Sequence, residues 1–263
     1  MSLGRLVIAG WVWGWVVPAG AQTPGVAAPE TYLYDHAGLG QTGAVVVELE
    51  AAVGTRDARP FGEHGVTTGV RGRFGVHDRV TLEVFGGTLR DGQGGQSAGG
   101  AVDVYVGVLD EATVGFDLTV GLGELYDYQQ VHTPRLHASL GKRLGALHVA
   151  LPVEVAIPVT TADQPARDPI DLTVGVVGSW GLSEALRVGL EAVGEDLEGF
   201  WDDEEAEGGA RMVVGPTFWG ALVGGWRLKL NLGGVFAATR NPSAPGVDTA
   251  AGFLGRFNLG YAF

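Results

Sequence analysis

The chain alternates apolar and polar residues over most of its length, and this alternation limits the folds open to it. In VTTGVRGRFGV, for example, valines and a phenylalanine share one face, while Arg71 and Arg73 lie on the other. A period of two places successive side chains on opposite faces of a β-strand. About twelve segments follow this pattern, at residues 44–53, 66–76, 80–88, 100–108, 114–122, 136–144, 147–157, 170–180, 186–193, 210–219, 226–237 and 251–263. No segment between them predicts a sustained helix, so we expect an all-β, antiparallel protein.

The first residues predict export from the cytoplasm. Arg5 is followed by an apolar run over residues 6–17, then by Pro18 and three small residues that end at Ala21. A basic start, a short apolar core and small residues are typical of a secretory signal peptide, which we expect to be cleaved after Ala21. The alternative, an uncleaved anchoring helix, needs about 20 apolar residues, and this run is shorter. The expected organisation is a signal peptide at 1–21, a periplasmic N-terminal segment at 22–42 and a β-barrel at 43–263.

Composition excludes several classes of protein. The chain has no cysteine, which excludes disulfides, thiolate catalysis and thiolate metal sites. Its formal net charge is −13, and without a basic stripe it does not suit nucleic acid as a partner. Its 45 glycines show no collagen-like triplet period. No later segment reaches the roughly eighteen apolar residues of a membrane helix, so any membrane crossing is expected to use strands.

The connections between these segments alternate in length. Short links are expected at 76–79, 109–112, 144–146, 181–185 and 220–225, and longer polar stretches at 54–65, 90–98, 123–135, 160–169, 194–209 and 239–249. Bacterial outer-membrane barrels have short periplasmic turns at one rim and longer extracellular loops at the other, whereas a soluble Greek-key sandwich has no reason to sort its loops. We therefore predict a closed transmembrane β-barrel of about twelve antiparallel strands, with short periplasmic turns and long extracellular loops.

Aromatic residues gather where such strands would meet the surfaces of a bilayer. Six are expected to form a periplasmic girdle: Phe74, Trp180, Phe218, Trp226, Tyr261 and Phe263. The last strand, GRFNLGYAF, also places Phe257 and Leu259 on the face of these aromatics. Its alternating aromatic end resembles the sorting signal of Gram-negative outer-membrane barrels. The resemblance implies recognition by the barrel-assembly machinery and a location in the bacterial outer membrane, reached through the periplasm.

Two strand–turn–strand phrases carry a finer resemblance. They are GRFGVHDRVTLEVFGG and GSWGLSEALRVGLEAVGED. Both resemble segments of outer-membrane proteins associated with the meta pathway of phenol degradation, some of which are described simply as transporters. The resemblance implies a transporter or porin.

The face opposite the apolar one would line the lumen, and it carries charges of both signs. Basic residues form one expected arc: Arg71, Arg73, Arg187, Arg211, Arg227, Lys229 and Arg256. Acidic residues form the opposing arc: Glu83, Asp103, Asp117, Glu154 and Asp171. Because opposed arcs of charge orient solutes and set ion preference, we predict a porin-like channel for the passive passage of small solutes or ions, with outer-membrane lipid around it and no cofactor.

Pairing of these charges would instead close the bore. In the expected barrel Glu48 and Glu50 stand beside Arg71, Arg73 and Arg256, so ion pairs are available. The inward glycines, in contrast, favour some open space: Gly69, Gly107, Gly115, Gly121 and Gly189. The alternative function is a non-conducting outer-membrane scaffold that presents binding loops.

Two weaker motifs suggest other chemistry. A membrane-embedded hydrolase would use Ser139 as nucleophile, His137 as base and Glu154 as the orienting acid. No nucleophile-elbow glycine pattern surrounds Ser139, so we do not expect an enzyme. The loop EDLEGFWDDEEAEGG is acidic enough to bind a divalent cation such as calcium, but it lacks the residue order of a calcium loop. A solvated extracellular loop is therefore favoured, and no metal site is assigned.

Overall fold

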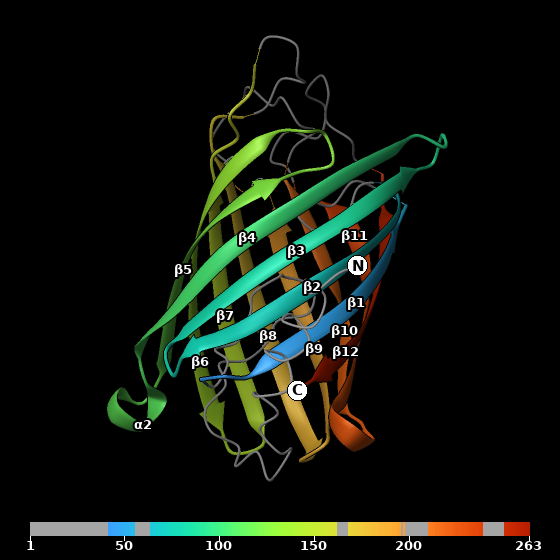
Figure 1. Ribbon diagram of the computed structural model, residues 1–263. Coiled ribbons are helices and arrows are strands. Elements are labelled where there is room, and N and C mark those ends of the chain that lie inside the picture. The colour runs from blue at the N-terminus through green and yellow to red at the C-terminus, as the bar shows by residue number, and fades with distance from the viewer. Residues whose placement is uncertain (1–41, 56–63, 162–167, 196, 198–209, 239–249) are drawn as a thin grey trace, which may run out of the picture.

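Twelve strands form one closed antiparallel barrel in the computed structural model of the protein (Figure 1). The structure describes residues 42–55, 64–161, 168–195, 197, 210–238 and 250–263, so the predicted signal peptide and most of the acidic loop lie outside it. The strands are β1 (Val45–Gly54), β2 (Gly65–His77), β3 (Val80–Asp91), β4 (Gln96–Leu109), β5 (Asp117–Tyr126), β6 (His132–Leu144), β7 (Leu147–Ala156), β8 (Asp171–Ser183), β9 (Leu186–Glu195), β10 (Arg211–Ala221), β11 (Trp226–Ala237) and β12 (Gly252–Ala262). The predicted fold class is confirmed.

The first and last strands pair with each other and close the barrel. β1 and β12 are antiparallel from Val46↔Ala262 to Gly54↔Leu254. The backbone N–H of Phe263 then donates to a carbonyl of the same pair of strands, that of Val45 (N···O 2.9 Å). β1 also pairs with β2, so every strand has two neighbours and no sheet edge stays open. Closure brings inward side chains of β1 beside those of β11 and β12, which are distant in sequence.

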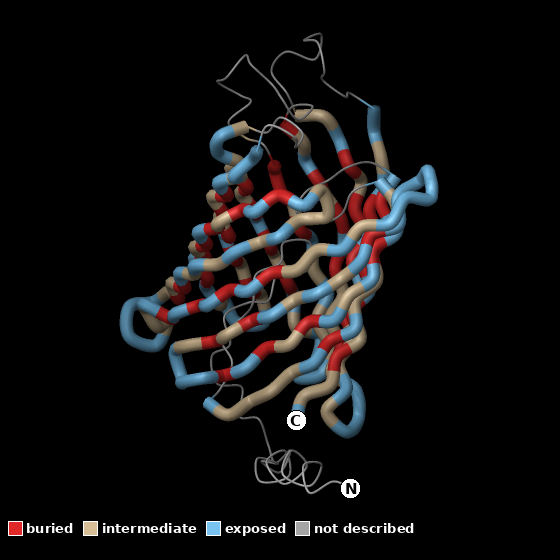
Figure 2. Tube along the Cα trace, turned by 45° about the horizontal axis from the view of Figure 1, so that its top comes forward, coloured by how far each residue is buried: buried red, intermediate tan, exposed pale blue. Residues whose placement is uncertain are grey.

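The barrel is apolar outside and polar inside. Buried and exposed residues alternate along the strands (Figure 2): Glu48 is 1% exposed, whereas the next residue, Leu49, is 56% exposed. The last strand follows the prediction, since Phe257 is exposed on the outer face and Arg256 is buried on the inner one. This arrangement reverses that of a water-soluble sandwich and is typical of a wall that contacts lipid.

One rim, which we name the turn rim, carries the tightest connections. It holds two short helices, α2 (Glu111–Val114) and η3 (Val223–Gly225), and the turns 78–79, 145–146 and 184–185 (Figure 1, lower end). The Asp110 carboxylate caps α2 by accepting from the Ala112 N–H (2.8 Å), and Gly115 ends the helix with φ 85°. Val114 therefore precedes β5, although the alternation predicted a strand from that residue. No helix among the described residues is long and apolar enough to cross a membrane.

The opposite rim carries most of the longer connections, at 55–64, 92–95, 127–131, 157–170, 196–210 and 238–251. The prediction that short and long links strictly alternate is wrong around α2: the link 110–116 on the turn rim is longer than both neighbouring links of the opposite rim, 92–95 and 127–131. Asp91 closes this tight turn, since its carboxylate accepts from the N–H groups of Gln93 (2.9 Å) and Gly95 (2.7 Å). The turn lets β3 and β4 pair out to Arg90↔Gln96, beyond the predicted strand ends.

Two prolines lie inside strands without ending them. The pairing of β7 with β8 stops at Ala150 and resumes at Val153 in the same register, on either side of Pro152. The pairing of β10 with β11 is likewise interrupted around Pro216. Because proline has no N–H to give to the ladder, the hydrogen bonding breaks locally while the strand continues.

Candidate functional site

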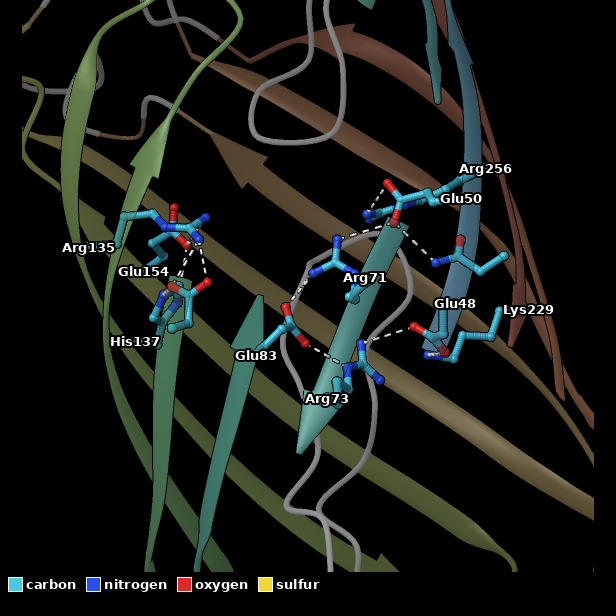
Figure 3. Close-up of polar contacts among 12 residues, drawn as sticks. Glu48, Glu50, Arg71, Arg73, Glu83, Arg135, His137, Glu154, Lys229 and Arg256 are labelled. Carbon is cyan, nitrogen blue, oxygen red and sulfur yellow. Dashed lines mark hydrogen bonds and ion pairs between the residues drawn. The ribbon is translucent and has the colours of Figure 1, made fainter. Parts of the chain in front are cut away.

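Charged side chains on the inner wall form two ion-pair networks (Figure 3). The first, the seam network, surrounds the closure of the barrel and consists of Glu48, Glu50, Arg71, Arg73, Glu83, Lys229 and Arg256. The second, the β4–β7 network, consists of Asp103, Arg135, His137 and Glu154. These side chains are nearly buried, so each is held in place by its partners in the network rather than solvated by bulk water.

Two arginines of β2 form the centre of the seam network. Arg71 pairs with Glu83 of β3 and with Glu50 of β1 (Nη2···Oε2 3.1 Å). Arg73 pairs with Glu83 (Nε···Oε2 2.6 Å) and more distantly with Glu48 (Nη2···Oε2 3.6 Å). The expected pairing of the two β1 glutamates with the β2 arginines is therefore confirmed, and it ties three neighbouring strands together.

Two further cations reach the same glutamates from the other side of the closure. Lys229 Nζ lies 2.7 Å from Glu48 Oε1, and Arg256 Nη2 lies 2.7 Å from Glu50 Oε1. Lys229 is on β11, so its side chain must pass over β12 to reach β1. On β12, Gly260 is the direct partner of Glu48, and a Cβ there would lie only 2.9 Å from Cγ of Glu48. Both contacts exist only because the barrel closes.

The β4–β7 network places two carboxylates around one guanidinium and one imidazole. Asp103 accepts two hydrogen bonds from Arg135 Nη2 (2.7 and 2.9 Å) and lies 3.0 Å from His137 Nε2. His137 Nδ1 lies 3.1 Å from Glu154 Oε2, and Arg135 Nη1 lies 3.7 Å from the same carboxylate. The ring of Tyr105 packs on His137 with 5.3 Å between centroids. The four charged groups thus form a compact cluster on three strands.

Glycines on β5 allow the side chains of β4 to reach β6. A Cβ on Gly123 would lie 1.8 Å from Asp103 Oδ1, and one on Gly121 would lie 2.7 Å from Cδ1 of Tyr105. Because β5 stands between β4 and β6, any larger residue at these two positions would collide with the β4 side chains. The two glycines are therefore part of the network although they carry no charge.

Other inward glycines are covered in the same way. A Cβ on Gly69 would lie 2.4 Å from the Phe85 ring, and one on Gly189 would lie 2.8 Å from Cγ2 of Thr217. Gly115 lies at the end of α2 and not in a strand. The interpretation of Gly69, Gly121 and Gly189 as open space is therefore wrong, because neighbouring side chains occupy the room that they leave.

The charged residues predicted for the lumen all lie on inward-facing strand positions. Four of the basic residues are buried, Arg71, Arg73, Lys229 and Arg256, and three are partly exposed, Arg187, Arg211 and Arg227. Of the acidic residues, Glu83, Asp103, Asp117 and Glu154 are buried and Asp171 is partly exposed. Their signs interleave: Glu83 lies between the two β2 arginines, and Arg135 lies among the acids. The structure therefore brings opposite charges together within each network.

The sequence prediction missed Arg135. Residues up to 135 were expected to form a loop, whereas β6 begins at His132 and includes Pro134. The signal that would have found Arg135 is the run Thr133, Arg135 and His137, which continues the inward period of two beyond the predicted strand end. The proline and the polar residues around it hid this continuation.

Ser139, His137 and Glu154 are not arranged as the catalytic site of a serine hydrolase. Both ring nitrogens of His137 face carboxylates, those of Asp103 and Glu154, so neither is available to Ser139. Ser139 Oγ is buried without a hydrogen-bond partner among the described residues. In the part of the chain that the structure describes, no group of three His, Cys, Asp or Glu residues is placed to hold a metal ion.

The aromatic residues predicted for a girdle lie near the turn-rim ends of their strands. Trp226, Tyr261 and Phe263 form a row of edge-to-face contacts, with centroid distances of 5.1 and 4.8 Å. Phe74 and Trp180 are exposed on the outer face, and Phe218 is partly exposed there. The barrel therefore has a band of outward-facing rings at this rim.

Known proteins resemble this chain in structure and not in sequence: no family model and no curated protein matches the sequence. The KdgM porin superposes with a TM-score of 0.58 at 10% identity, covering 83% of this chain and 99% of that one. The NanC porin gives 0.55 at 9% identity, covering 82% and 98%. An outer membrane channel from Pseudomonas putida F1 gives 0.54 at 13% identity, covering 84% and 94%. At these identities the likeness establishes the barrel fold.

Proposed function

We propose that the protein is an outer-membrane channel through which small solutes or ions pass passively along a narrow, charged lumen. The observation that carries the proposal is the reversed polarity of the wall. Large apolar side chains are exposed on its outer face, while the charged residues of both networks lie inside. A water-soluble barrel would gain nothing from this arrangement, whereas a membrane channel needs an apolar outer face toward lipid and a polar inner face toward water.

The structural likeness supports this function. Three proteins that share the fold are named as porins or as an outer membrane channel. One structure of the KdgM porin is described as a complex with disordered oligogalacturonate, a polar solute. A lumen lined by charged groups suits small polar solutes for the same reason: its fixed charges replace part of the water that surrounds them.

The membrane partners follow from the same faces. Lipid contacts the apolar outer face, and the aromatic band at the turn rim lies at the periplasmic interface. The alternating aromatic strand β12 is the part that the barrel-assembly machinery recognises, after a signal peptide at residues 1–21 has directed export. The turns 78–79, 145–146 and 184–185 then face the periplasm, and the longer connections face the outside.

Ion preference in this channel depends on the networks as units. The basic residues of the seam network and the acids paired with them hold one another in place, so each cluster presents a fixed local field to a passing ion. Neutralising a single cation of the seam network, as in Arg256→Gln, leaves Glu50 with less compensation. The lumen then becomes more favourable to cations.

A second function is favoured by one observation, the tight burial of these charges. Glu83 is 1% exposed and Asp103 is 2% exposed, as expected where paired side chains fill a bore. In that case the barrel is a non-conducting scaffold, and its longer loops perform the function.

Single-channel recording separates the two functions. Protein purified from outer membranes is inserted in a planar bilayer, and ion selectivity is taken from the reversal potential in a potassium chloride gradient. Discrete conductance steps, with cation preference increased in Arg256→Gln, are the result expected of a channel. Persistent silence from protein whose β-barrel fold is verified by circular dichroism refutes the channel and favours the scaffold.

A further inference from the structure

A third group of charged residues lies in the lumen near the turn rim, apart from the two networks. It contains Arg143 of β6, His148 of β7 and Arg187 of β9, all at inward positions close to the turns 145–146 and 184–185. All three are basic side chains, although only Arg187 belongs to the predicted lumen set. Among the described residues, no carboxylate forms an ion pair with His148 or Arg187 at this end of the barrel.

The register of the strands brings these three side chains together. Arg143 is the direct partner of His148 across β6 and β7, and His148 is the direct partner of Ser179 across β7 and β8. Arg187 approaches from β9 and lies over Gly181 of β8, where a Cβ would be 3.7 Å from its Nη1. Since β8 carries only a glycine and a serine here, the Arg187 guanidinium extends back toward β7. The charges of both arginines act on the His148 ring.

His148 supplies the observation that indicates a ligand. The residue is only 4% exposed, and its Nε2 has no hydrogen-bond partner among the described residues. A buried polar atom without a partner is costly, and native structures usually provide one or bind one. Two arginine charges act on this ring, so the missing partner is expected to be negatively charged. The Ser179 hydroxyl offers a further donor beside it.

Two acids lie on the β5 side of this group, while Glu184 of the turn 184–185 is exposed. Glu111 and Asp117 stand at the β5 side, where Glu111 accepts from the backbone N–H of Arg143 (2.9 Å) and Asp117 accepts from the backbone N–H of Glu111 (2.7 Å). The Asp117 carboxylate also interacts electrostatically with Arg143. The two acids compensate the Arg143 side of the group. On the β8 and β9 side, the inward positions next to Arg187 are Ser179, Gly181 and Gly189, none of which is acidic. These strand positions therefore supply no acid to pair with His148 or Arg187.

We propose that Arg143, His148 and Arg187 form a binding site for the anionic group of a small solute, a carboxylate or a phosphate, at the turn-rim end of the lumen. The guanidinium groups hold the two oxygens of the anion and the imidazole donates from Nε2. The site deepens the proposed function, because it makes organic or phosphorylated anions the solutes that this channel handles. It rests on that function only for the passage of these anions through the barrel, since binding itself requires no conduction.

The test is a titration that observes the site directly. The full chain, labelled with ring-¹³C histidine and purified in detergent micelles, is titrated with sodium phosphate and, separately, with sodium acetate. The His148 resonance is identified by its absence from His148→Gln. The expected result is a saturable shift of this resonance by one or both anions. The half-saturation concentration should rise about tenfold in Arg187→Gln, because one charge-assisted pair of hydrogen bonds is lost.

Lys142→Gln provides the matched control. Lys142 adjoins Arg143 in sequence and carries the same charge, but its side chain is exposed on the outer face. Its substitution is expected to leave the titration unchanged. A His148 resonance that does not move with either anion, or that titrates alike in Arg187→Gln and Lys142→Gln, overturns the site.

Conductance recordings on the same preparation test the binding site and the channel independently. A silent barrel in which phosphate or acetate still shifts His148 keeps the site and refutes the channel. A conducting barrel in which His148 stays fixed keeps the channel and refutes the site. A shift by phosphate alone assigns the site to phosphorylated solutes, and a shift by acetate assigns it to carboxylates.

Discussion

The substitution Gly123→Ala tests whether the inward glycines of β5 serve the β4–β7 network. The added Cβ would lie 1.8 Å from Asp103 Oδ1 and 2.9 Å from the Val102 carbonyl oxygen, so the carboxylate must move. Asp103 is held by Arg135 and His137, and its movement sacrifices at least one hydrogen bond to a charged group, about 2 kcal/mol. Alanine regains roughly 0.5–1 kcal/mol of backbone entropy in a strand. The expected net loss of unfolding free energy is therefore about 1–1.5 kcal/mol.

The assay is urea unfolding of the barrel in lipid vesicles, followed by tryptophan fluorescence. Gly86→Ala is the control, because a Cβ there meets no atom within 4 Å, and it is expected to stabilise by about 0.5 kcal/mol. In an Asp103→Ala background the clash with the carboxylate is gone, so Gly123→Ala should lose most of its cost. Equal stability of Gly123→Ala and Gly86→Ala, or the same cost with and without Asp103, refutes the reasoning.

Three further outcomes are expected. Glu83→Gln removes the carboxylate shared by two buried arginines and should lower the unfolding free energy by about 3 kcal/mol in the same assay. Glu124→Gln, at an exposed pair with His132, should lower it by less than about 1 kcal/mol. Similar losses in the two variants would contradict the assigned burial. Gly115→Ala forces alanine into φ 85° at the end of α2 and should lower the unfolding free energy by about 1 kcal/mol. Gly145→Ala, in a neighbouring turn with φ 65°, should show a similar loss. At the turn rim a hydrogen bond from the Thr42 hydroxyl lowers the pKa of Asp78, so the ionised form stabilises the fold above the usual pKa and this contribution is lost as the pH falls through the lowered value. Thr42→Val should raise the pKa of Asp78 in an NMR titration, and an unchanged value would show that the hydrogen bond has no influence.

Most of the fold could be predicted from the sequence because strand faces follow from local pattern. The period of two assigns Phe257 to the outer face and Arg256 to the inner face without any knowledge of neighbouring strands. It failed where other local chemistry interrupts the pattern. Asp110 and Gly115 cap a short helix before β5. Pro134 interrupts the alternating pattern at the start of β6, so the residues from His132 to Arg135 were not predicted as strand.

The candidate site was less predictable because ion pairs join residues on different strands. Glu48 and Glu50 could be matched with the arginines of the adjacent strand β2, since neighbours in a hairpin are known once the turn is known. The contacts of Asp103 with Arg135 and of Glu48 with Lys229 cross an intervening strand. They depend on register, on barrel closure and on glycines that leave room for the crossing.

The sequence by itself therefore determined that this chain forms about twelve antiparallel strands with a lipid-suited outer face and a charged inner face. Alternation is a local property, and each strand displays it independently of the others. Only the tertiary structure decided which charges meet, because a pair such as Lys229 and Glu48 forms through closure of β1 on β12. The register of adjacent strands decided that inward glycines such as Gly123 are covered by neighbouring side chains. It also left His148 buried beside two arginines, with one ring nitrogen lacking a partner among the described residues.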